Sequence, residues 1–150
     1  MLSNSKELFL IYKRISEQHK IYDYNVELSG TYGYIKLDRD RIVELCNTCS
    51  VGEKNNTVQP LVNFSSWNEM IDNRFFWHTH PGALSDASAN DFEAFDEIMQ
   101  YMKINAIRCN VAFMIISTKY KEITVYFVTN GIMTKKLYYI LSNCLRTVNI

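Results

Sequence analysis

The chain has 150 residues, 47% of them hydrophobic and 21% charged, and its 16 basic and 16 acidic side chains give a formal net charge of zero. This length and composition predict one globular domain, residues 1–150, that buries roughly two-thirds of the surface of its unfolded chain. The absence of a concentrated basic face argues against nucleic-acid binding, and no stretch approaches the roughly 20 apolar residues of a membrane span. The N-terminal segment is too often interrupted by charges to be a secretory signal, so we expect a cytoplasmic protein.

The first elements along the chain are a helix and a strand. Apolar residues recur at helical spacing in residues 5–19, which indicates an amphipathic helix. Residues 24–37 then alternate as a strand does. Gly30 and Gly33 within this strand favour a bulge or the close approach of another backbone.

The next region is a short strand followed by an irregular segment. Residues 41–46 are predicted to form the strand, and the polar residues 47–72 form the longest irregular stretch, either a functional lid or a plain surface loop. Cys46 and Cys49 have the spacing of a zinc or redox pair. A structural zinc site needs a second pair or two histidines at matching spacing, so metal or redox binding is the minor alternative for these cysteines.

The second half of the chain is predicted as β-α-β-β-α, with strands at 74–80, 109–118 and 122–128 and a helix at 88–101. After Gly131, six apolar residues at helical spacing predict a closing helix: Leu137, Ile140, Leu141, Cys144, Leu145 and Val148. The whole order describes an α+β protein with helices against a mixed sheet.

Two histidines stand at the end of the predicted strand 74–80. Side chains on a strand alternate, so His78 and His80 point the same way, roughly 7 Å apart along the chain. Two neutral imidazoles at that separation can share one zinc ion, and Asp91 is a candidate third ligand. Three protein ligands and one open position are typical of a catalytic zinc site. Taken singly, two such histidines are more often ordinary polar residues on an exposed face.

Ser88 and Asp91 also fit a capping box, in which Ser88 caps the helix and Asp91 lies in its first turn. This interpretation is compatible with metal binding, because an aspartate in a first helical turn can still reach a metal ion. The sequence therefore predicts capping by Ser88 whether or not Asp91 binds a metal.

The joint pattern of these residues is specific. His78-x-His80, seven residues, Ser88, two residues and Asp91 resemble the JAMM signature of the JAB/MPN metalloprotease family. The flanking sequence FFWHTHPG is similar to the stand-alone JAB proteins of bacteria and their viruses, and the resemblance is firm over residues 75–102. It implies a JAB/MPN-like α/β/α sandwich of the cytidine-deaminase-like kind, with a mixed, mostly antiparallel sheet.

By this resemblance, one zinc ion per chain would be held by His78, His80 and Asp91. Ser88 would hydrogen-bond the attacking water or the tetrahedral oxyanion. The zinc deaminases have a related sandwich, but they need His-x-Glu and Pro-Cys-x-x-Cys, and neither motif occurs in this sequence.

The family also uses a glutamate from the first strand region as general acid/base, which contributes roughly 10²–10⁴-fold to the rate. Glu27 matches those relatives that place the glutamate three residues before a glycine. Asp23 stands where many other members place it, one methylene shorter. We expect Glu27 to have this role and keep Asp23 as its alternative.

The function implied by the resemblance is hydrolysis of an amide or isopeptide bond by a zinc-dependent peptidase. The substrate in such proteins is often the C-terminal tail of a ubiquitin-like protein, held extended beside a sheet edge; other peptides are the alternative. A non-catalytic MPN-like scaffold that binds a partner is the competing function. The presence of all three metal ligands favours the enzyme. The oligomeric state is left open.

Overall fold

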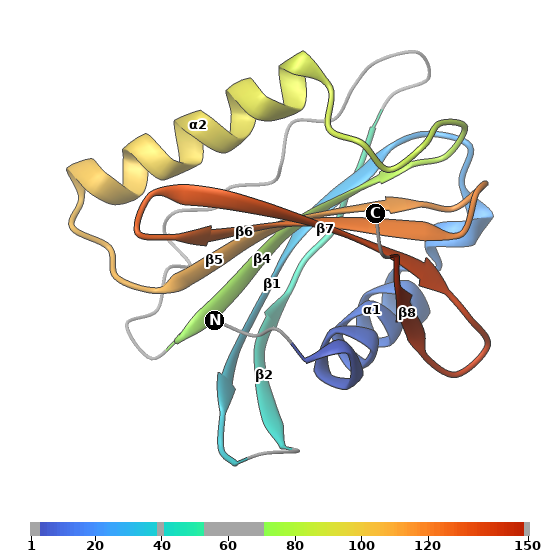
Figure 1. Cartoon of the computed structure of the whole chain (residues 1–150), viewed down its shortest axis with the longest axis horizontal. Helices are drawn as coiled ribbons and strands as arrows, with labels where there is room; N and C mark the ends of the chain where they lie inside the picture. Colours follow the sequence, from blue (N-terminus) through green and yellow to red (C-terminus); the bar gives the residue numbers. More distant parts are fainter. Residues whose placement is uncertain (1–3, 39–40, 53–70, 149–150) are drawn as a thin grey trace.

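The computed structural model describes residues 4–38, 41–52 and 71–148 (Figure 1). In these ranges two α-helices, α1 (Ser5–His19) and α2 (Ala89–Ile104), lie on opposite sides of one eight-stranded sheet. A short 3₁₀ helix, η1 (Ile21–Asp23), follows α1. The strands are β1 (Leu28–Lys36), β2 (Ile42–Asn47), β3 (Ser50–Val51), β4 (Asn73–His80), β5 (Asn110–Ser117), β6 (Glu122–Thr129), β7 (Ile132–Ile140) and β8 (Leu145–Thr147).

The sheet is mixed and mostly antiparallel. Its strand order is β2-β1-β4-β5-β6-β7-β8, and β3 pairs with β1 beside β2. Only β4 and β5 are parallel among the described pairs, and α2 connects them, because parallel neighbours need a long crossover. The predicted α+β class with a mixed, mostly antiparallel sheet is confirmed, and a helix on each face is consistent with an α/β sandwich.

Each face of the sheet has its own hydrophobic core, since strand side chains alternate. On one face α1 packs against β4 through Phe75 and Trp77, which are fully buried. On the other face Phe76 of β4 packs against Phe95 and Ile98 of α2. Because α2 covers the face to which Phe76 points, it also covers the face of His78 and His80.

The helices have ends that their sequences explain. Asn4 caps α1 by accepting a hydrogen bond from the Lys6 amide at 2.9 Å, and Lys20 ends it in the left-handed conformation. Ser88 caps α2. In the described ranges, neither helix is long and apolar enough to cross a membrane.

The two glycines of β1 have the uses that the sequence predicts. A Cβ at Gly30 would lie 1.8 Å from the carbonyl oxygen of Thr48, so only glycine allows the turn between β2 and β3 to cross so close. The pairing of β1 with β2 shifts register between Gly33 and Tyr34, which is the expected bulge.

The predicted closing helix is wrong. The segment after Gly131 forms β7 and β8, and β7 pairs with β6 through a two-residue turn of Asn130 and Gly131, both with positive φ. Asn-Gly is the strongest short hairpin signal, because both residues tolerate this conformation. Its presence overrides the helical spacing of Leu137 and the apolar residues that follow it.

Candidate metal centre

β4 brings two histidines to the same end of the sheet. All eight residues of this strand are buried, and Pro81 follows it directly, where a residue without a backbone N–H ends the pairing. His78 and His80 are two positions apart, so both point to the face covered by α2. The ring of His78 packs against that of Phe95, with centroids 6.4 Å apart, which limits its rotation.

Asp91 completes the group from the first turn of α2. His78 Nε2 lies 3.1 Å from His80 Nε2 and 3.2 Å from Asp91 Oδ1, and His80 Nε2 lies 3.3 Å from Asp91 Oδ2. Two ligands of a tetrahedral zinc ion with bonds of 2.0–2.1 Å are about 3.3 Å apart. The spacing of these three side chains therefore fits a zinc ion, and the His-His-Asp group could hold one.

A backbone carbonyl sets the orientation of the His80 ring. His80 Nδ1 lies 2.8 Å from the carbonyl oxygen of Leu84, so Nδ1 has the proton and donates it. In the neutral ring this leaves Nε2 with a free lone pair, the form that binds a metal. A main-chain acceptor has no side-chain signature, so sequence reasoning missed Leu84.

Asp91 takes part in the capping box and the metal group at once. Its amide donates to Ser88 Oγ at 3.1 Å, and its Oδ2 accepts the Ser88 amide at 2.9 Å. Burial alone would raise the pKa of Asp91, but the hydrogen bonds of His78 and His80, the charge of His78 and the Ser88 amide together hold this pKa well below its usual range. The carboxylate is therefore ionised and fixed in the state that binds a cation.

The pKa of His80 shows the same coupling from the other side. Burial lowers it, yet the hydrogen bonds to Asp91 and to the Leu84 carbonyl, with the negative charges of Asp91 and Glu27, raise the pKa above its ordinary value of 6.5. Without a metal, this site attracts a proton for the same reason that it attracts a cation.

Glu27 lies beside this group, immediately before β1. Its Oε1 is 4.0 Å from His80 Nε2, a longer separation than any between the three candidate ligands. Its carbonyl accepts the Gly52 amide at 2.8 Å, which ties the segment to the end of β3. The structure thus brings Glu27 to the metal group, whereas Asp23 lies on the exposed side of η1.

Ser88 is the N-cap of α2, as the sequence predicts. Its side chain accepts the Asp91 amide, and both hydrogen bonds of the capping box are present. The hydroxyl proton is not used in this bond and is available to a second acceptor. The role of Ser88 towards an oxyanion stays a prediction.

The structure places Cys46 and Cys49 on opposite faces of the sheet. Cys46 Sγ lies near Gly33, on the face of β1 opposite the α1-face core, while Cys49 packs into that core. Burial raises the pKa of the Cys49 thiol, which makes it less reactive. In the described ranges, neither cysteine belongs to a group of ligands close enough to share a metal ion.

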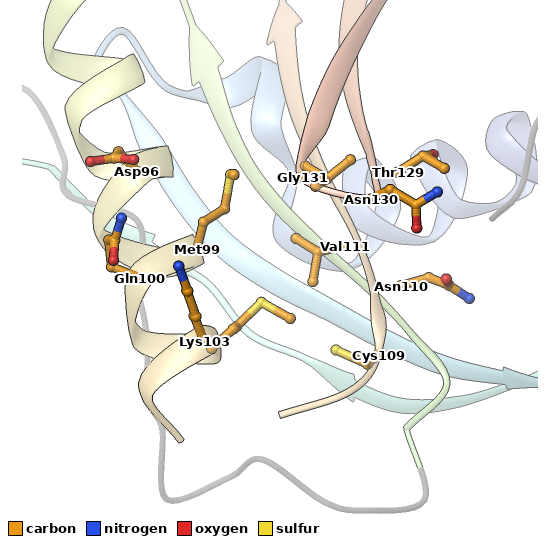
Figure 2. A pocket seen from close by; sticks show the side chains of 12 residues that line it. Asp96, Met99, Gln100, Lys103, Cys109, Asn110, Val111, Thr129, Asn130 and Gly131 are labelled. Atoms are coloured by element: carbon orange, nitrogen blue, oxygen red, sulfur yellow. The ribbon is translucent and has the colours of Figure 1, made fainter. Parts of the chain in front are cut away.

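A cavity of about 510 Å³ lies away from the metal group. Figure 2 shows its side chains coming from the later turns of α2 on one side and from the start of β5 and the β6–β7 turn on the other. Lys103, on its wall, is about 18 Å from Asp91 along the helix at 1.5 Å per residue. None of the predicted site residues lines this cavity.

No protein-family model, curated protein or solved structure matches this chain. The JAB/MPN resemblance therefore depends on the signature residues and on the geometry that they adopt.

Proposed function

We propose that this chain is a zinc-dependent peptidase or isopeptidase with a JAB/MPN-type fold and one zinc ion per chain. The observation that supports this most is the convergence of His78, His80 and Asp91, with ligand atoms 3.1–3.3 Å apart, beside the carboxylate of Glu27. A purely structural zinc site would use four protein ligands, whereas three are grouped among the described residues. The fourth position is then available for water and substrate.

The chain's own residues divide the remaining work. Zinc in this site would lower the pKa of a water towards 7 and polarise the scissile carbonyl. Glu27 would accept the water's proton and pass a proton to the leaving amine, since its carboxylate lies beside the ligands but farther from His80 than they lie from one another. Ser88 would donate a hydrogen bond from its hydroxyl group to the oxyanion, while the hydroxyl oxygen caps α2.

The substrate that we propose is an extended peptide, a class that includes the narrow C-terminal tail of a ubiquitin-like protein. Such a tail offers few side chains, so main-chain hydrogen bonds to a strand edge would bind it. β3 pairs with β1 on one side, and no strand of the described chain pairs with its other side. β3 itself lies beside Glu27, because the amide of Gly52, the residue after this strand, donates to the Glu27 carbonyl.

The experiment that tests the function separates metal binding from chemistry. Glu27→Gln keeps the size of the side chain but cannot take the water's proton. We expect an unchanged zinc content by metal analysis and a loss of turnover of at least about 10²-fold. Turnover is measured on peptides ending in Gly-Gly and on isopeptide-linked peptides, with Asp23→Asn as the matched control that keeps most of the activity.

Two results would contradict the proposal. A wild-type protein that binds one zinc ion but cleaves none of these substrates would favour the non-catalytic scaffold. An active Glu27→Gln variant beside an inactive Asp23→Asn variant would move the general base to Asp23.

A further inference from the structure

Three polar side chains form a row across the sheet at its metal-binding end. In the strand register, His80 of β4 pairs with Ser117 of β5, and Ser117 pairs with Glu122 of β6. All three lie on the α2 face, because each is in phase with a residue of that core, such as Phe76 of β4 and Tyr126 of β6. All three are buried, which is unusual for charged and polar groups without a structural role.

This row holds three consecutive residues of the segment 81–88, which joins β4 to α2. Ser117 Oγ donates to the carbonyl of Ala83 at 2.6 Å. His80 Nδ1 donates to the carbonyl of Leu84 at 2.8 Å. Glu122 Oε1 accepts both the amide and the hydroxyl of Ser85, at 2.9 and 3.0 Å. Each strand thus fixes one residue of the connection.

Glu122 makes the strongest of these attachments. Its oxygen accepts two hydrogen bonds, and bonds to a carboxylate are roughly twice as strong as bonds between neutral groups. Ser85 is completely buried, and its hydroxyl also lies 2.7 Å from Thr124 Oγ1. Two residues further on, the Ala87 amide donates to the hydroxyl of Tyr126 at 3.0 Å. One face of β6 therefore fixes this segment up to the cap of α2.

We propose that Glu122 is a positioning residue of the metal centre. By holding Ser85, it fixes the carbonyl of the adjacent Leu84 in front of His80 Nδ1. That carbonyl keeps the proton on Nδ1 and aims the lone pair of Nε2 at the metal position. The inference rests on the metal group of the proposed function but not on peptide hydrolysis.

The test compares Glu122→Ala with Glu122→Gln. The alanine variant loses both hydrogen bonds to Ser85, whereas the glutamine oxygen can still accept them. We expect the zinc dissociation constant, measured by competition with a chelator, to rise about 10–100-fold in Glu122→Ala. A change of this size is typical when the hydrogen bond to the other ring nitrogen of a ligand histidine is lost. Glu122→Gln should restore most of the affinity.

A second readout follows the ring itself. Nitrogen-15 NMR of the neutral His80 ring in metal-free protein reports which nitrogen has the proton. Wild type and Glu122→Gln should have it on Nδ1, and Glu122→Ala should show a mixture of the two tautomers. A residue that only supported the fold would leave this ratio unchanged.

The matched control is Asn73→Ala at the opposite end of β4. Asn73 is also buried and accepts a side-chain hydrogen bond from Asn110 at 3.1 Å, so its loss lowers stability without touching the segment 81–88. Zinc affinity and the His80 tautomer should stay as in wild type. Every protein is measured at a temperature at which its circular dichroism spectrum matches that of folded wild type.

If Glu122→Ala does not fold, Ser85→Ala decides, because it removes only the hydroxyl and should weaken zinc binding in the same direction. Unchanged zinc affinity and an unchanged tautomer in the folded variants would overturn the inference. If the variants show these effects but the wild-type protein cleaves no peptide, the proposed hydrolysis alone is contradicted.

Discussion

Zinc should stabilise the metal-free protein with a stoichiometry of one ion per chain. The three ligand atoms already lie at the separations of a zinc site, so binding needs little rearrangement of the chain. At a free zinc concentration of 100 times the dissociation constant, the free energy of unfolding rises by about 2.7 kcal/mol. At about 2–4 °C per kcal/mol for a chain of this size, the melting temperature should rise by about 5–11 °C.

The variant that tests this assignment is His80→Ala. It leaves only two members of the ligand group and removes the partner of the Leu84 carbonyl. We expect the zinc-dependent rise in melting temperature, followed by differential scanning calorimetry, to disappear almost completely. The matched control replaces both Cys46 and Cys49 by serine and should keep the full rise. Retention of the rise in His80→Ala, or its loss in the cysteine variant, would refute the placement of the metal.

Three further predictions concern the cap, the pH and a glycine. Ser88→Ala should lower the free energy of unfolding by about 1 kcal/mol and, if the hydroxyl donates a hydrogen bond to the oxyanion, reduce turnover by about 10²–10³-fold. A variant with a lower melting temperature but normal turnover would show that the serine only caps the helix. Because the pKa of His80 is raised above 6.5, a proton on this ring competes with zinc, so the zinc affinity measured by titration should begin to fall on acidification while the pH is still above 6.5. A zinc affinity that stays unchanged down to about pH 6, below the ordinary histidine pKa of roughly 6.5, would contradict this. Gly30→Ala should lower the free energy of unfolding, measured by denaturant unfolding, by at least the roughly 1–3 kcal/mol of an overpacked site. The reason is that its Cβ would lie 1.8 Å from the Thr48 carbonyl oxygen. Gly82→Ala is the matched control, because the space around its added methyl group is open.

The metal group could be predicted from sequence because its parts are local. His78 and His80 share a strand face by simple alternation, and Asp91 follows in the first turn of the next helix. The signature spans only the segment from β4 to α2, so no long-range pairing had to be guessed. Glu27 was less certain, because its position depends on how β1 pairs with β4.

What the sequence could not predict depends on contacts between distant segments. Glu122 is an ordinary acidic residue at the start of a hairpin strand until the parallel pairing of β4 with β5 places it near Ser85. The prediction of a helix at the end of the chain was wrong for a different reason. Leu137 and Leu145 fit a helical period, yet Tyr138 and Leu145 are buried as strand residues against the core on the α1 face. Residues 53–70, in the predicted irregular stretch, lie outside the described residues.

The ligands come from two elements with very different packing. β4 is central and buried along its whole length, so its amides should exchange with solvent hydrogen only when the molecule unfolds globally. Asp91 lies in an end turn of α2 flanked by the exposed residues Ser88 to Asn90, and end turns open with little free energy. Loss of a bound metal ion should therefore begin with the release of Asp91 at this helix end, while the two histidines stay in place on the buried strand.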